Sequence, residues 1–264
     1  MNNSIERAFA KGKAFIPFIT AGDPDLDTTE RLICAMAENG ADLIEIGIPF
    51  SDPVAEGPVI QRASERALAT GITTDDIMDM VESVRKKTDV PLAFMTYINL
   101  IFTYGADRFM KRCKELDIAA VIIPDIPYEE KAELTPSCKK YGIKLISLIA
   151  PTSKDRIKMI AKEAEGFIYC VSSMGVTGMR SEMNKHISDM IDSVKEVNDI
   201  PCAVGFGVST PEQAAEYARY ADGVIVGSAV VKIVEEYGKD SIEPVSEYIK
   251  SMKEAVSEAL VATA

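Results

Sequence analysis

The segment ADLIEIGIPFSDPVAEGP, residues 41–58, joins an apolar strand to an irregular loop, and this unit decides the predicted fold. Within the strand, side chains alternate between two faces: Leu43, Glu45 and Gly47 on one, Ile44, Ile46 and Ile48 on the other. Three prolines and one glycine between residues 49 and 58 then prevent regular structure. The segment therefore predicts a short strand followed by a loop of roughly ten residues.

Two acidic residues lie in different parts of this segment. Glu45 is inside the apolar strand near its C-terminal end, where an ionised carboxylate costs on the order of several kcal/mol unless it is paired. Glu56 is on the loop, which could close over the strand end. A rigid acid and a mobile one suit acid/base catalysis. The alternative is a structural ion-pair partner and a solvated loop charge, and this segment alone does not choose between them.

The same strand-and-helix unit recurs along the chain. Eight apolar segments alternate with helical patterns, and strands are expected at residues 14–22, 41–48, 90–97, 118–125, 143–151, 166–172, 200–208 and 222–228. These segments are nearly continuous apolar runs, as expected of parallel strands buried on both faces. The helix-to-strand joins NGADLIEIG, YGIKLISLI and YADGVIVGS resemble one another, which supports one repeated βα unit.

Eight such units predict an α/β fold, a closed (β/α)8 TIM barrel in a single domain covering residues 1–264. An open doubly wound sheet is disfavoured, because no GxGxxG motif follows the first strand. Extra helices are expected at the two ends, near residues 5–10 and 245–260. The helical pattern at residues 129–140 is weaker because Pro136 interrupts it.

Composition excludes several classes of protein. The chain has 264 residues and a formal net charge of −12, which argues against non-specific nucleic-acid binding, since that binding depends on Lys and Arg. Its five cysteines are widely spaced and form no CxxC pair, so they predict reduced core thiols, not a metal site or a disulfide framework. No signal peptide and no apolar run near 18 residues is present, so a cytoplasmic protein is expected.

Glycines gather where the seventh and eighth strands end, which in a barrel is the functional face. Gly205, Phe206 and Gly207 allow a close backbone approach, and Gly227 and Ser228 open a helical pattern. A helix N-terminus offers free amides and a partial positive charge, which suit a phosphate group. The alternative is that these glycines only permit tight packing. Their clustering at two strand ends favours a site for a phosphorylated metabolite.

Other residues carry weaker signals. Tyr169 is expected on the inward face of the sixth strand, and Asp125 either accepts hydrogen bonds from backbone amides or meets a neighbouring subunit. His186, the only histidine, lies among polar helix residues and is expected at the surface. Lys144 lies near the start of the fifth strand, at the wrong end of the barrel for a Schiff base.

Seven collinear segments resemble the tryptophan synthase α subunit family over essentially the whole chain. They are PFITAGDP (17–24), EIGIPFSDPVAEGP (45–58), MTYINLIFTYG (95–105), IPDIPYEE (123–130), YCVSSMGVTG (169–178), GFGVSTPEQ (205–213) and GSAVVK (227–232). The resemblance implies cleavage of indole-3-glycerol phosphate to indole and glyceraldehyde 3-phosphate. It implies no cofactor in this chain.

The family's functional positions carry over to residues of this sequence. Glu45 is implied as the acid/base, and Glu56 as the group at the indole N–H. The residues implied around the indole are Phe18, Leu100, Tyr169 and Thr177. The phosphate-binding set is implied to be Gly178, Gly205, Phe206, Gly207, Gly227 and Ser228.

At the position of Glu56 the family usually has aspartate. The extra methylene could displace the carboxylate by about an ångström. We therefore expect activity to depend more on loop closure, and Glu56→Asp to be no slower than the natural chain.

The resemblance also implies a partner, a pyridoxal-phosphate β subunit in an α2β2 heterotetramer. Residues 49–58, 172–186 and the rim near Asp125 are the expected contact surface. Three alternatives stay open: another phosphate-binding barrel enzyme, a non-catalytic regulatory subunit, and a free-standing lyase. The first is disfavoured by the motif at residues 45–58.

Overall fold

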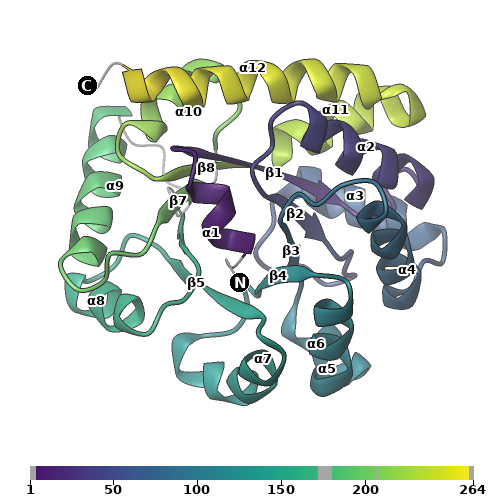
Figure 1. Ribbon diagram of the computed structural model, residues 1–264, viewed down its shortest axis with the longest axis horizontal. Helices are drawn as coiled ribbons and strands as arrows, with labels where there is room; N and C mark the ends of the chain where they lie inside the picture. The colour runs from purple at the N-terminus through teal and green to yellow at the C-terminus, as the bar shows by residue number, and fades with distance from the viewer. Residues whose placement is uncertain (1–3, 172–179, 206, 262–264) are drawn as a thin grey trace.

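The computed structural model describes residues 4–171, 180–205 and 207–261, and they form a closed barrel (Figure 1). Each strand pairs in parallel with the next, and β8 pairs with β1. The strands are β1 (Ala14–Thr20), β2 (Ile44–Gly47), β3 (Leu92–Met95), β4 (Ile118–Ile122), β5 (Lys144–Ile149), β6 (Ile168–Val171), β7 (Cys202–Gly205) and β8 (Gly223–Val226). The predicted eight-stranded barrel is confirmed.

Helices surround the barrel and close its amino end. They are α1 (Ser4–Phe9), α2 (Leu26–Glu38), α3 (Pro58–Ala69), α4 (Thr74–Arg85), α5 (Ile98–Tyr104), α6 (Ala106–Glu115), α7 (Thr135–Tyr141), α8 (Lys154–Lys162), α9 (Arg180–Lys195), α10 (Pro211–Ala218), α11 (Ser228–Tyr237) and α12 (Ile242–Val261). Two 3-10 turns, η1 (Tyr128–Glu133) and η2 (Gly238–Asp240), complete the description. Ile5 of α1 packs with residues inside the barrel, so this helix covers the barrel's amino end (Figure 1).

The alternation seen in the sequence separates two layers of core. Inward side chains, including Leu43, Phe167 and Tyr169, pack inside the barrel. Outward side chains, including Ile44 and Ile46, pack against the helices. Burying both faces in this way explains why the strands read as continuous apolar runs.

One region differs in detail from the prediction, and another agrees with it. The sequence does not predict α5, whose first amide, from Ile98, donates to Asp125 Oδ1 at 3.0 Å. The helical pattern at residues 129–140 is divided as expected, into η1 and α7, and Pro136 lies in the first turn of α7, where its missing N–H has no helical partner to lose. Among the described residues, no helix is both long enough and apolar enough to span a membrane.

Candidate active site

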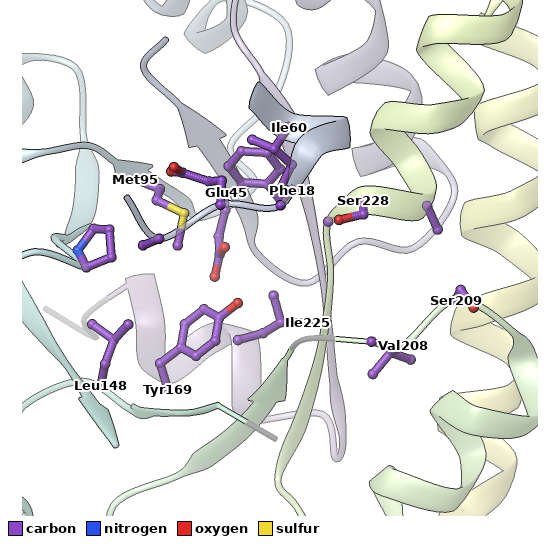
Figure 2. A pocket seen from close by; sticks show the side chains of 17 residues that line it. Phe18, Glu45, Ile60, Met95, Leu148, Tyr169, Val208, Ser209, Ile225 and Ser228 are labelled. Atoms are coloured by element: carbon purple, nitrogen blue, oxygen red, sulfur yellow. The ribbon is translucent and has the colours of Figure 1, made fainter. Parts of the chain in front are cut away.

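A cavity of about 310 Å³ lies at the carboxyl end of the barrel (Figure 2). Its walls come from strands β1, β2, β3, β5, β6 and β8, from the loops that follow β2, β4, β7 and β8, and from the first turns of α3 and α11. The lining residues are Phe18, Glu45, Ala55, Glu56, Gly57, Ile60, Met95, Pro124, Leu148, Tyr169, Gly207, Val208, Ser209, Ile225, Gly227, Ser228 and Ala229. Most of these are apolar, so a carboxyl group here is set in a low-polarity surface.

Glu45 is fully buried on the inward face of β2, and its carboxyl group reaches the cavity. Within the described residues, neither of its carboxyl oxygens has a hydrogen-bond partner. Burial raises its pKa to about 8, so the group is mostly protonated at neutral pH. In Figure 2 the Glu45 and Tyr169 side chains point toward one another across the cavity. A buried carboxyl without a protein partner is costly, and such groups concentrate at functional sites.

Glu56 is held by a different set of contacts. The Tyr97 hydroxyl donates a hydrogen bond to Glu56 Oε2, and the same hydroxyl accepts from the amides of Val54 at 3.1 Å and Ala55 at 3.0 Å. Burial raises the pKa of Glu56, the Tyr97 hydrogen bond lowers it, and the nearby charge of Asp125 raises it further. The Tyr97 hydroxyl therefore binds both the backbone of the loop that follows β2 and the carboxyl group of Glu56 on that loop.

Two glycines make room for the aromatic walls of the cavity. A Cβ atom on Gly47 would lie 2.5 Å from Phe18, and a Cβ on Gly205 would lie 2.5 Å from the Tyr169 hydroxyl. These distances are too short for any real contact, so Phe18 and Tyr169 can take their places only because both strand positions lack a side chain.

The other end of the cavity is formed by backbone. Gly227, Ser228 and Ala229 line it at the start of α11, and Gly227 caps the helix without a side-chain hydrogen bond. By contrast, α10 begins with a reciprocal capping box between Thr210 and Gln213. The first amides of a helix have no acceptor within the helix, so those of α11 are available to an anion. Gly207 completes this end with a φ of +77°, which favours glycine.

Comparison with known proteins agrees with this geometry. The family model described as "Tryptophan synthase alpha chain" matches residues 6–260. The tryptophan synthase alpha chain of Lacticaseibacillus casei is 49% identical over 94% of this chain and 93% of its own length. That of Thermoanaerobacter sp. (strain X514) is 46% identical over 96% of this chain and all of its own.

The chain belongs to the tryptophan synthase alpha chain family.

Solved structures of tryptophan synthase have the same fold as this chain. The subunit alpha from Legionella pneumophila str. Paris has a TM-score of 0.88 and 37% identity, covering 98% of this chain and 100% of its own. A structure of the Pyrococcus furiosus tryptophan synthase α2β2 complex has a TM-score of 0.84 and 36% identity, covering 91% of this chain and 98% of its own.

The structure brings most of the predicted site residues of this family member to one cavity. Seven line it: Phe18, Glu45, Glu56, Tyr169, Gly207, Gly227 and Ser228. Gly205 does not line it but lies behind the Tyr169 ring, which is the packing role considered as the alternative for these glycines. Thr177, Gly178 and Phe206 lie outside the described residues.

Leu100 is not supported as a cavity residue. It lies on α5 and packs against the outer core, away from the cavity walls. The cavity wall near the end of β3 is formed instead by Met95, which pairs with Gly47 in the register of β2 and β3.

Several residues of the site are missed in the sequence: Met95, Leu148 and Ile225, which line the cavity, and Tyr97, which does not line it but holds Glu56. The first three lie on inward faces near strand ends, so the period-two pattern combined with the barrel could have found them. Tyr97 carries no such signal, because its partner Glu56 is 41 residues away along the chain.

The structure also shows where Asp125 and His186 lie, two residues with weaker signals in the sequence. Asp125 accepts a hydrogen bond from a backbone amide, that of Ile98, which is the first of the two roles considered for it. His186 is exposed on α9, as predicted. Among the described residues, no group of three or more His, Cys, Asp or Glu side chains is arranged to hold a metal ion.

Proposed function

We propose that this chain cleaves indole-3-glycerol phosphate into indole and glyceraldehyde 3-phosphate. The observation that carries the proposal is the buried carboxyl of Glu45, which has no hydrogen-bond partner in the described part of the chain and lies in an apolar cavity whose far end is the N-terminus of α11. An indole ring fits the apolar end and a phosphate group fits the amide end.

Glu45 supplies both proton transfers in this proposal. In its protonated form it donates to C3 of the indole, so that the ring becomes an electron sink. The resulting carboxylate then removes the proton from the hydroxyl on the adjacent glycerol carbon. The carbon–carbon bond breaks, the hydroxyl carbon becomes the aldehyde, its electrons return to the ring, and Glu45 is again protonated. The raised pKa of about 8 keeps the starting form available at neutral pH.

Glu56 assists at the ring nitrogen. Protonation at C3 places positive charge on the indole N–H, and the Glu56 carboxylate at the cavity wall can accept a hydrogen bond from it. Phe18 and Tyr169 hold the ring, while Gly207, Gly227 and Ser228 hold the phosphate. We also propose the predicted roles of Thr177, Gly178 and Phe206, which rest on the family resemblance alone.

We further propose a tryptophan synthase β subunit as partner, which would take up the indole and hold the pyridoxal phosphate. The α2β2 complex of the relative from Pyrococcus furiosus supports this assembly. The proposed reaction needs only this chain's own carboxyl groups and amides.

The test is indole release from indole-3-glycerol phosphate by the purified chain, alone and with a β subunit. We expect slow release that rises strongly with the partner, and a fall in kcat of about 10²- to 10⁴-fold for Glu45→Gln, the usual contribution of a general acid/base. Glu65→Gln, an exposed acid on α3, is the matched control and should match wild type. If Glu45→Gln keeps full activity, or if wild type releases no indole with the partner present, the proposal is wrong.

A further inference from the structure

Two helices that begin at the cavity pack against each other. Helix α3 begins at Pro58, two residues after Glu56, and α11 begins at Ser228 with its amides in the cavity wall. Ala63 of α3 and Val231 of α11 form a small buried cluster with Phe18 of β1. Both helices are additions to the basic barrel unit, since each is followed by a second helix before the next strand or the chain end.

A polar bridge fastens the same two helices farther from the cavity. Arg66 of α3 makes two parallel hydrogen bonds with Asp23, from Nε to Oδ1 and from Nη2 to Oδ2, each at 2.8 Å. Its Nη1 also donates to Glu235 of α11 at 3.0 Å. Arg62, one turn earlier on α3, binds both oxygens of Glu235 at 2.9 and 3.2 Å. Arg66 thus joins α3, α11 and the loop after β1.

Asp23, which binds Arg66 in this bridge, is buried and lies in a hydrogen-bonded loop. Its side chain is only 3% exposed, and the backbone around it is held in place by the amide of Gly22, which donates to the Thr29 hydroxyl at 3.0 Å. Two residues later, Asp25 caps α2 and also pairs at 2.7 Å with Lys239, which follows α11. The loop after β1 is therefore linked to the C-terminal end of α11 indirectly, through Arg66 of α3 and through Lys239 of the following turn.

We propose that Arg66 is a positioning residue for phosphate binding, which rests on the proposed function. The amides of α11 bind an anion only where the helix places them, and Gly227 gives that end no side-chain hydrogen bond of its own. Helix α11 packs on β1, α3 and α12, and the bridge at Glu235 adds a polar contact to α3 that fixes its position further. A helix of ten residues is short and stiff, so a shift at the bridge moves the amides that face the phosphate.

The chemistry of arginine is essential to this role. Its planar guanidinium bonds Asp23 with two nitrogens and still presents a third to Glu235, a geometry that the single ammonium of lysine cannot reproduce. Arg66→Lys should therefore keep the charge but restore only part of the positioning.

The first experiment compares wild type with Arg66→Met. We expect KM for indole-3-glycerol phosphate to rise about tenfold, since an ångström-scale misplacement can cost up to about 100-fold, with kcat changed less than about threefold. Calorimetric titration with glycerol 3-phosphate should show the same tenfold loss of affinity. Titration with indole, which has no phosphate, should be unchanged within about twofold. Arg66→Lys should fall between wild type and Arg66→Met in each phosphate measurement.

Glu235→Gln provides a second variant that leaves the partly buried Arg66–Asp23 pair in place, and it should weaken glycerol 3-phosphate binding in the same direction. Arg108→Met is the control, because Arg108 also joins two helices through an ion pair, with Asp75 at 3.0 Å between α6 and α4, but this pair is exposed and neither residue lines the cavity. It should leave both affinities unchanged.

Three results would overturn the inference: reduced thermal stability with unchanged affinity for glycerol 3-phosphate, equal losses for glycerol 3-phosphate and indole, or a fall in kcat with KM unchanged. The titrations need no catalysis. If wild type failed to cleave the substrate, the proposed function would fall, while the phosphate affinities would still decide the role of Arg66.

Discussion

The buried carboxyl of Glu45 lowers the stability of the folded chain as the pH rises. Burial raises its pKa to about 8, above the ordinary value for glutamate, so the folded chain holds this proton more tightly than the unfolded chain does. As pH rises from about 4.5 to 8, the unfolded chain releases the proton while the folded chain keeps it. The free energy of unfolding therefore falls across this range and levels off above it.

Glu45→Gln should abolish this fall in the free energy of unfolding, because glutamine does not titrate. We expect the variant to be more stable than wild type, by an amount that grows between pH 5 and pH 8 to on the order of a few kcal/mol. Urea unfolding at both pH values measures it, with Glu65→Gln as the exposed control. A stability difference that is the same at pH 5 and pH 8 would show that Glu45 has no raised pKa.

Tyr97 offers a second test at the level of one hydroxyl group. Tyr97→Phe removes the donor to Glu56 and the acceptor of the Val54 and Ala55 amides, so the loop should be held less firmly. We expect kcat/KM for indole-3-glycerol phosphate to fall about tenfold, the usual effect of losing such a hydrogen bond. Tyr104→Phe, which removes a hydroxyl bound to Asp75 on the outer helices, should change kcat/KM little. Equal effects of the two variants would argue against a role for Tyr97.

The two acids also show what the sequence can and cannot predict at this scale. Glu45 is visible because a charged residue stands in an apolar strand at a position that a barrel directs inward. Leu100 is not among the residues that line the cavity, since it lies on α5, and nothing local reveals that this helix begins soon after β3. Contacts such as Tyr97 with Glu56 depend on how separate strand ends meet, which local patterns do not contain.

At the scale of elements, the barrel was predictable because each strand repeats the same signal. Helix α5 was not, since it has only seven residues and its start is stabilised by Asp125 from the loop after β4. Short helices are marginal by local propensity alone and depend on such tertiary contacts. Helix α7 tolerates Pro136 for a local reason, because the proline lies in its first turn, where a backbone N–H has no acceptor within the helix.

The loop between β7 and α10 allows a test of one backbone conformation. Gly207 and Gly142 have similar φ values, +77° and +74°, and no atom of the described residues lies within 4 Å of the place where a Cβ would be at either position. Replacing either by alanine should destabilise the fold by about 1 kcal/mol, because alanine disfavours positive φ. Only Gly207→Ala should also weaken the binding of glycerol 3-phosphate, since Gly142 ends α7 and does not line the cavity. Urea unfolding and calorimetry separate the two effects, and equal phosphate affinity in both variants would remove Gly207 from the site.

At the scale of the whole molecule, the closed barrel brings to one end groups that are far apart in the chain. Glu45, Tyr169 and Ser228 come from β2, β6 and the start of α11, and they meet in one cavity. The two extra helices, α3 and α11, then cover adjacent parts of that end. This arrangement leaves the loop that carries Glu56 at the surface, where a partner could hold it closed.

The surface near that loop supports the proposed partner. Val54 is 80% exposed on the loop and Phe102 is 47% exposed on α5, and Tyr97 links these two segments because it caps α5 and binds the Val54 amide. Exposed apolar side chains at such a place are typical of interaction sites. We expect Val54→Asp to weaken the affinity for a β subunit by about tenfold or more, since a charge would then be buried in the interface.

Tyr220→Asp is the control for Val54→Asp, because Tyr220 is another exposed apolar side chain. It is 43% exposed but lies after α10, just before β8 begins, at the amino end of the barrel. Tyr220→Asp should therefore leave partner affinity unchanged, whereas its effect on solubility should resemble that of Val54→Asp. Calorimetric titration of each variant with the β subunit measures the difference, and indole release without partner should be equal in both. If the two variants bound the partner equally well, the carboxyl-end loops would not form the interface, and closure of the Glu56 loop would have to arise from substrate binding alone.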